Sequence, residues 1–375
     1  MRHLRGRVLV ATLVLVALLP APVASAHPME VVADGLDNPR HLTVDKHGVV
    51  YVAEAGVGGS DVCQAPVPED PDFEICLGAT GAITRVAGGT QERVVEGLPS
   101  LSDNPDGFAT IGPHDVTTHG LGRFQVSIGL FAPAQLREGF GEAGALLSQV
   151  VRVTNAGNVV PQADLAAFEI AENPDPADND SNAYGLLDQP GPRAVVDASG
   201  NTLLRYGPLG RVSLLATFPP QLVPNPFDPA GPDFPMQSVP TAVVQGRDGA
   251  YYVSELTGFP FTKGLARIWR VVPGQEPEVY ATGFTNLIDL DIDRHGNLYA
   301  LELVREGLLS VGEELPPPPE LLTGRLVKIT PDGDQIELAS EGLVAPGGVA
   351  VGRDGIYVTN YSVFPEQGQV VRLRP

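Results

Sequence analysis

A short pattern occurs six times along the 375 residues of this chain. Each copy is a run of alternating apolar residues, a tight turn that contains glycine, and a second run of predominantly apolar residues. Alternation on both sides of a short glycine turn is typical of a β-hairpin. Because repeats of one unit dictate the architecture of the whole chain, these copies constrain the fold more than any other feature. They begin at Gly35, Gly112, Asn182, Ser238, Phe284 and Ala345.

A third extended segment follows each hairpin, and all six segments carry a basic residue at the same position. A ring of positive charge is one interpretation. We favour a structural cation that pairs with acids of its own or a neighbouring repeat, because a feature shared by every repeat serves the repeat itself. The residues are Arg85, Arg152, Arg205, Arg270, Lys328 and Arg372.

A fourth segment completes several repeats, as in QERVVEGL (91–98), but the last repeat reaches Pro375 before such a segment. Its match is MEVVADGL, residues 29–36. We therefore expect an all-β fold, a six-bladed β-propeller of four-stranded antiparallel blades forming a single domain over residues 27–375. The N-terminal strand would complete the last blade and close the ring without an unpaired edge.

The first 26 residues have the form of a secretory signal. Three arginines precede an uncharged apolar run over 8–19, and Ala24-Ser25-Ala26 supplies a small-residue cleavage site. The apolar run is too short to span a bilayer, which takes roughly 20 residues. Cleavage after Ala26 would remove three arginines and no acids, so the formal charge of −21 becomes −24. Such a surface disfavours nucleic acids and anionic membranes, and we expect an extracytoplasmic monomer.

Two cysteines, Cys63 and Cys76, lie in one Gly/Pro-rich stretch. An even number of cysteines in an exported chain predicts a disulfide. The bridge would close a loop of about 14 residues and stabilise the fold by roughly 3 kcal/mol in the chain-entropy model. We expect it to staple a loop and not to specify the fold.

Candidate site residues lie where the long connections between second and third segments surround the channel, since loops on a rigid scaffold carry variable chemistry. Carboxylate and amide oxygens there suit Ca²⁺, and the same groups with imidazole suit a polar ligand in a concave site. The metal candidates are Asn38, Asn182, Asn286 and Asp289. The ligand-binding candidates are His41, His114, Asp115, Glu54, Glu255 and Glu302.

A structural role is the alternative for these residues. Asparagine favours turns, and a glutamate repeated at strand ends can hold neighbouring backbone. A separate acidic group, Asp175, Asp178 and Asp180, is a further candidate for Ca²⁺, although its spacing is not that of an EF-hand loop. The sequence contains no nucleophile elbow, P-loop, dinucleotide fingerprint or zincin motif.

Several stretches resemble the ScyD/ScyE-type family of secreted bacterial propellers, which have NHL-like repeats. They are CLGATGAITRV (76–86), SNAYGLL (181–187), VVDASGNTLLRYG (195–207) and VPTAVVQGRDGAYYVSELTGFPF (239–261). The resemblance covers essentially the whole mature chain and implies an exported propeller. The family has no agreed catalytic residues, so the resemblance implies none here.

Two functions follow as hypotheses. One is a secreted, non-catalytic binding or accessory protein that uses the long-loop face for a small polar ligand or an extracellular protein, with Ca²⁺ at the channel mouth as an option. The other is a metal-dependent propeller enzyme of the lactonase or sugar-oxidising type, which rests on analogy between folds.

Overall fold

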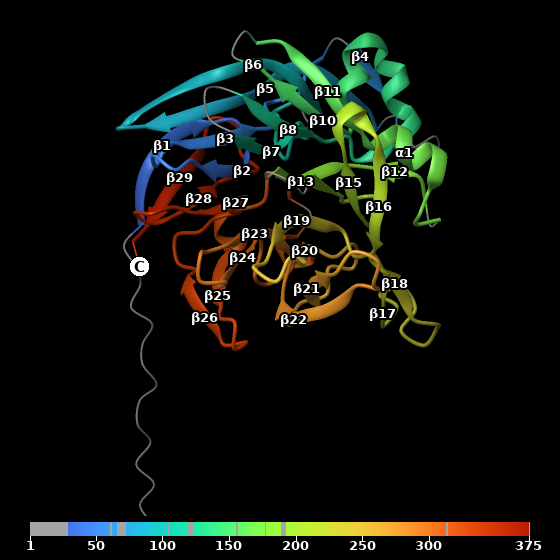
Figure 1. The fold of residues 1–375 in the computed structure, drawn as a ribbon. Coiled ribbons are helices and arrows are strands. Elements are labelled where there is room, and N and C mark those ends of the chain that lie inside the picture. Colours follow the sequence, from blue (N-terminus) through green and yellow to red (C-terminus); the bar gives the residue numbers. More distant parts are fainter. Residues whose placement is uncertain are drawn as a thin grey trace, which may run out of the picture.

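The protein is a six-bladed β-propeller, which confirms the predicted fold (Figure 1). The computed structural model describes residues 29–60, 62–65, 73–103, 105–118, 123–154, 157–176, 178–188, 193–312 and 314–374. The predicted signal peptide, residues 1–26, lies outside the described residues. Within those ranges no helix has the length and apolar character needed to cross a membrane.

Each blade is an antiparallel sheet whose strands follow from the channel outward. Blade one contains β2 (Pro39–Val44), β3 (Val50–Glu54), β5 (Ile75–Ala87) and β6 (Thr90–Ser102). Blade two contains β7 (Pro113–Thr118), β8 (Phe124–Ile128), β10 (Gln149–Val153) and β11 (Val159–Asp164). Blade three contains β13 (Ala183–Asp188), β14 (Arg193–Asp197), β15 (Thr202–Tyr206) and β16 (Val212–Thr217). Blade four contains β19 (Pro240–Gln245), β20 (Tyr251–Glu255), β21 (Ala266–Val271) and β22 (Glu278–Phe284). Blade five contains β23 (Leu287–Ile292), β24 (Leu298–Glu302), β25 (Arg325–Ile329) and β26 (Gln335–Ala339). Blade six contains β27 (Gly348–Val351), β28 (Ile356–Asn360), β29 (Gly368–Leu373) and β1 (Met29–Leu36).

The hydrophobic core lies between neighbouring blades. The second strand of each blade is buried on both faces, whereas most of the outer strands keep an exposed face. One cluster joins Val196, Val253, Leu301 and Val358, which come from the second strands of blades three to six. This double burial explains why these strands read as near-continuous runs of valine, tyrosine and leucine.

The predicted ring closure is confirmed. Strand β1 pairs with β29 in antiparallel register, from Met29 opposite Leu373 to Leu36 opposite Gly368. Leu36 is 2 % exposed and packs with Val52 of blade one. The first described strand therefore belongs to the last blade and also seals the junction with the first.

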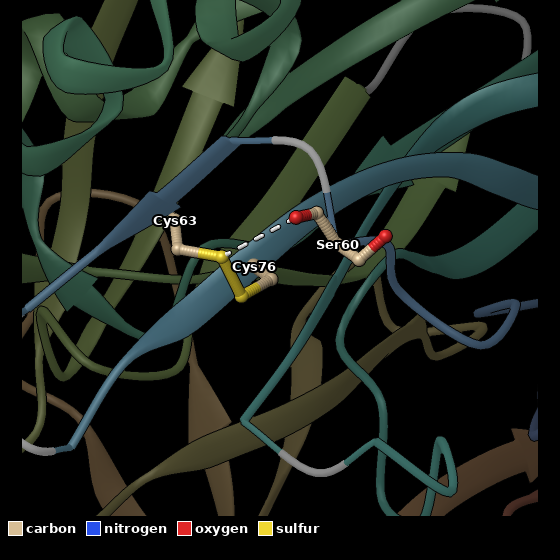
Figure 2. The surroundings of a disulfide bond; sticks show 3 residues. All are labelled: Ser60, Cys63 and Cys76. Carbon is tan, nitrogen blue, oxygen red and sulfur yellow. Dashed lines mark hydrogen bonds between the residues drawn. A yellow bond between two sulfur atoms is a disulfide. The ribbon is translucent and has the colours of Figure 1, made fainter.

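The predicted disulfide is also present. Cys63 on β4 (Val62–Gln64) bonds Cys76 on β5, and the two strands pair at these residues (Figure 2). The bridge fastens a short extra strand to the edge of blade one, which agrees with its expected role as a loop staple.

The connections within and between blades contain elements that the repeat did not predict. Helix α1 (Leu165–Glu172) links blades two and three; Asp164 caps its first turn by accepting the Ala167 N–H, and Asn173 ends it in a left-handed conformation. The remaining short elements are β9 (Ala132–Pro133), β12 (Asp180–Ser181), β17 (Gln221–Val223), β18 (Phe234–Met236), η1 (Ala134–Leu146), η2 (Pro208–Gly210), η3 (Leu308–Val311) and η4 (Pro319–Leu321).

The repeated cation of the third strands has the structural role that we favoured at three positions. Arg85 pairs with Glu92 of its own blade, and Arg270 pairs with Asp248 and Glu278. Arg372 pairs with Asp354 and, across the ring closure, with Glu30.

Candidate functional site

Three of the predicted site residues meet inside the channel. Nδ1 of His41 lies 3.5 Å from Oδ2 of Asp115 and 3.6 Å from Oδ1 of Asp289. They come from the innermost strands of blades one, two and five, at equivalent positions of the repeat. Because the repeat places equivalent residues at one height around the axis, His41 can contact acids from two other blades.

These groups alter one another's protonation. Burial would lower the pKa of His41, but the negative charges of Asp289 and Asp115 outweigh it and raise the pKa to about 9. Burial raises the pKa of Asp289 to about 7, against the opposing effect of His41. At neutral pH His41 is therefore an imidazolium held between two acids.

The channel aspartates also bond neighbouring blades to each other. Asp115 accepts the backbone N–H of Leu186 in blade three. Asp289 accepts that of Val349 in blade six, and Asp291, two residues further along β23, accepts that of Val351. Innermost strands of adjacent blades do not share a sheet, so these carboxylates supply hydrogen bonds that the backbone leaves unmade.

Buried side chains fill the channel beyond His41, toward the starts of the inner strands. The rings of His114 and Tyr184 lie 4.2 Å apart, and Tyr184 meets His41 edge-on at 5.2 Å. Nδ1 of His114 bonds the carbonyl of Ala183, and Arg40 donates to the carbonyl of Thr110. Burial and the nearby Arg40 charge lower the pKa of His114 well below its ordinary value, so this imidazole is neutral.

A cavity of about 340 Å³ lies on the opposite side of His41. The inner strands line it as far as their last residues before the hairpin turns, such as Val44, Thr118 and Ile292. This cavity thus opens toward the hairpin-turn face, whereas the sequence led us to expect the site at the long-loop face. The reason is that Tyr184, His114 and Arg40 occupy the channel on the long-loop side.

The predicted asparagines fasten loops. Asn38 donates to the carbonyls of Gly56 and Gly107, and Asn286 donates to that of Leu256. Asn182 accepts the N–H of Leu130. Asn38 and Asn286 have φ of 50° and 47°, a left-handed conformation that asparagine tolerates.

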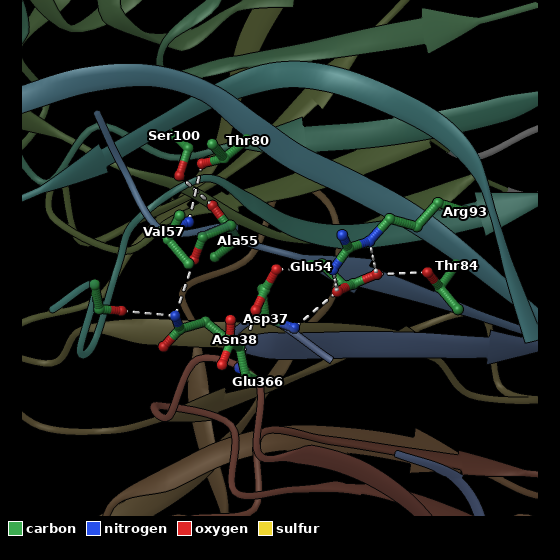
Figure 3. Close-up of polar contacts among 12 residues, drawn as sticks. Asp37, Asn38, Glu54, Ala55, Val57, Thr80, Thr84, Arg93, Ser100 and Glu366 are labelled. Atoms are coloured by element: carbon green, nitrogen blue, oxygen red, sulfur yellow. Dashed lines mark hydrogen bonds and ion pairs between the residues drawn. The ribbon is translucent and has the colours of Figure 1, made fainter. Parts of the chain in front are cut away.

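The predicted glutamates lie within the blades and pair with arginine. Glu54 accepts the N–H of Asp37, the hydroxyl of Thr84 and two bonds from Arg93 (Figure 3). Each glutamate thereby ties the segment that enters its blade to a later strand of the same blade. Glu255 does so with Ser238 and Arg267, and Glu302 with Thr285 and Arg325.

Sequence reasoning missed these arginine partners. Arg267 and Arg325 stand three residues before the repeated cations Arg270 and Lys328, in the same third strands, where Arg267 is the second residue of β21 and Arg325 the first of β25. The sequence does carry a signal for these pairs. Two repeats whose second strand ends in glutamate also have an arginine early in the third strand.

Metal coordination is not preformed around these acids. Among the residues that the structure describes, no group of three or more His, Cys, Asp and Glu side chains is arranged to hold a metal ion. Within the channel, the His41 imidazolium takes the place between Asp115 and Asp289 that a cation would favour.

No known protein-family profile matches this chain, and no curated protein matches it in sequence. Solved structures share its fold. A gluconolactonase from Xanthomonas campestris is 9 % identical, with a TM-score of 0.52 over 92 % of this chain and 89 % of that one. A putative glucose dehydrogenase from Thermus thermophilus is 18 % identical, with a TM-score of 0.50 over 93 % and 100 %. A calcium-binding regucalcin from Agrobacterium tumefaciens is 12 % identical, with a TM-score of 0.49 over 93 % and 94 %.

Proposed function

We propose that this chain is an exported, non-catalytic binding protein of the ScyD/ScyE type that takes a small cationic ligand into the channel cavity. The observation that carries the proposal is the charge of the cavity wall. Its described lining contains Asp115, Asp289 and Asp291 but neither lysine nor arginine, and His41 offsets only one of the three acids. A cavity with one sign of charge concentrates ligands of the opposite sign.

The size and chemistry of the cavity suit a small organic cation. A volume of about 340 Å³ is at the lower end of ligand pockets in proteins. Each carboxylate oxygen that accepts one backbone N–H keeps a second lone pair for a ligand ammonium. Asp291 is only partly buried, near the opening, and is the acid best placed to meet such a group first.

Binding is favoured over catalysis because of the protonation of His41. A general base must be unprotonated at the working pH, and the two acids hold the His41 proton up to about pH 9. Export is supported by the signal-like residues 1–26 and by the Cys63–Cys76 disulfide, a bond typical of oxidising compartments.

Calorimetric titration tests the proposal. Alkylammonium and diammonium ions of increasing length should bind at low ionic strength, and affinity should rise between pH 5 and 8, because burial raises the pKa of Asp291 to about 6 and that of Asp289 to about 7. Asp291→Asn should weaken binding about tenfold or more, as expected for loss of a charge-assisted bond. Asp332→Asn removes the same charge from an exposed turn and should leave binding unchanged. Equal affinity in both variants, or no binding of any ammonium probe, would exclude this function.

The metal-dependent enzyme is the second candidate, and one observation favours it: three groups with raised pKa values face one cavity, as in many active sites. In that case Ca²⁺ would replace the organic cation beside Asp289. Proton release from a simple sugar lactone, followed at constant pH with and without Ca²⁺, separates the two. Turnover that needs Ca²⁺ and is lost in Asp289→Asn would establish the enzyme.

A further inference from the structure

A second group of acids lies outside the channel, where helix α1 stands beside β12 (Figure 1). Glu169 on α1 is 1 % exposed, and neither of its carboxylate oxygens has a hydrogen-bond partner in the described part of the chain. Buried carboxylates without partners are rare because the lost hydration costs several kcal/mol or more. Glu169 therefore lacks the partner that its burial demands.

Asp197, at the end of β14, shares this place with Glu169. A Cβ atom on Gly200 would lie 3.0 Å from Oε2 of Glu169 and 3.2 Å from Cγ of Asp197. The two carboxylates thus border one small space, which the glycine keeps open. Asp197 is fully buried and is held rigidly by the N–H groups of Asn182 and Gly200 and the hydroxyl of Ser181.

Three acids of the segment that follows α1, Asp175, Asp178 and Asp180, lie close enough to influence this pair electrostatically. Burial, and then the charges of Asp197, Asp175, Asp178 and Asp180, raise the pKa of Glu169 to about 8. Burial, Asp178 and Asp197 raise the pKa of Asp180 to about 6. Four acids therefore lie within electrostatic reach of one buried carboxyl group.

We propose that this group, formed by Glu169, Asp175, Asp178, Asp180 and Asp197, is a Ca²⁺ site that ties α1 to blade three. Glu169 and Asp197 are its fixed part. Asp178 is exposed on a loop and has to swing inward to complete the coordination shell, so the acids are not at coordination distance beforehand. Ca²⁺ accepts six to eight oxygens in irregular geometry, whereas Mg²⁺ demands a near-ideal octahedron. The site is independent of the channel and of the function proposed for it.

Thermal unfolding of the mature chain, first stripped with EDTA, tests this site. At a hundredfold excess over its Kd, Ca²⁺ should raise the melting temperature by about 4 °C, and Mg²⁺ should have much less effect. Glu169→Gln keeps the shape of the side chain and replaces the carboxyl group, which is protonated at neutral pH without Ca²⁺, by a neutral amide. This variant should therefore melt close to the wild-type temperature without Ca²⁺ and should lose the Ca²⁺ shift. Asp178→Asn should reduce the shift. Asp291→Asn, in the channel, should keep all of it.

Proton release gives a second readout. Since burial and neighbouring acids hold a proton on Glu169 at neutral pH, Ca²⁺ binding at pH 7 should release it, which calorimetry in two buffers of different ionisation enthalpy measures. No Ca²⁺ shift in the wild type, or a shift of equal size in Glu169→Gln, would overturn the site. If Asp291→Asn abolished the shift, Ca²⁺ would bind in the channel, and this result would also overturn the site proposed beside α1.

Discussion

Nδ1 of His41 lies 3.6 Å from Oδ1 of Asp289, although the two residues belong to blades one and five and are separated by the whole of blade six. Contacts of this kind cross the channel and hold distant blades at a fixed distance. They also make the stability of the ring depend on pH.

The pH dependence follows from the raised pKa of His41. A folded-state pKa above the unfolded value adds stability that is complete below pH 6.5 and is lost as the pH rises through about 9. Asp289, with its pKa raised to about 7, likewise stabilises less as the pH rises from about 4 to 7. The free energy of unfolding, measured with urea, should therefore fall steadily from pH 6 to pH 9.5.

Removing both partners should flatten this decline. The double variant His41→Gln/Asp289→Asn lacks the coupled pair, so its stability should change much less between pH 6.5 and 9. The double variant His47→Gln/Asp332→Asn changes two exposed residues of the same types and should follow the wild type. Parallel curves for all three proteins would show that the pair does not set the dependence.

Buried and exposed arginine pairs should differ in their effect on stability. Arg325 pairs with Glu302, whose side chain is fully buried, so Arg325→Met leaves a buried charge without its cation and should cost about 3 kcal/mol. Arg85 and Glu92 are both solvent-accessible, and Arg85→Met should cost less than about 1 kcal/mol. Urea midpoints at one pH make the comparison, and equal losses would contradict the anchoring role of the strand-end glutamates.

Loss of the disulfide should leave the propeller folded. Replacing Cys63 and Cys76 with serine frees a loop at the edge of blade one, and the cost should not exceed about 3 kcal/mol. Unfolding should stay cooperative, while limited proteolysis should cut the 60–75 segment sooner. Thiol titration of the unreduced, denatured wild type checks the bond itself, with two free thiols as the contrary result.

Ring closure can be tested within strand β1. Leu36 is buried against blade one, so Leu36→Ala should cost about 2 to 5 kcal/mol. Val31 lies on the same strand but is 52 % exposed, and Val31→Ala should cost less than about 0.5 kcal/mol. A chain shortened to begin at Asn38 should aggregate through the open edge of β29. If that shortened chain melted at the wild-type temperature, the pairing of β1 with β29 would not stabilise the ring.

The blades, the ring closure and the disulfide were predictable because each depends on a pattern local to the repeat. Alternation identified the strands, and the match of 29–36 to other fourth strands identified the partner of β29. The meeting of His41, Asp115 and Asp289 in the channel was also predictable, since the three residues occupy one position of the aligned repeat.

The position of the cavity was not predictable in the same way. It depends on the bulk of Tyr184 and His114 in one half of the channel, and residues on neighbouring blades meet there without any shared sequence pattern. Glu169 was missed for a related reason. Helix α1 lies in a connection outside the repeat, so no alignment of blades points to it.

The pairing of β1 with β29 has a consequence for how the chain is made. Glu30 bonds Arg372, 342 residues later, so β1 must wait for β29 to be synthesised before it has its partner strand. Until then β1 can contact blade one but has no partner strand in blade six. The ring therefore cannot lock before β29 is made, and a chain whose ring stays open exposes two complementary edges, β1 and β29, that can join the matching edges of other molecules into chains.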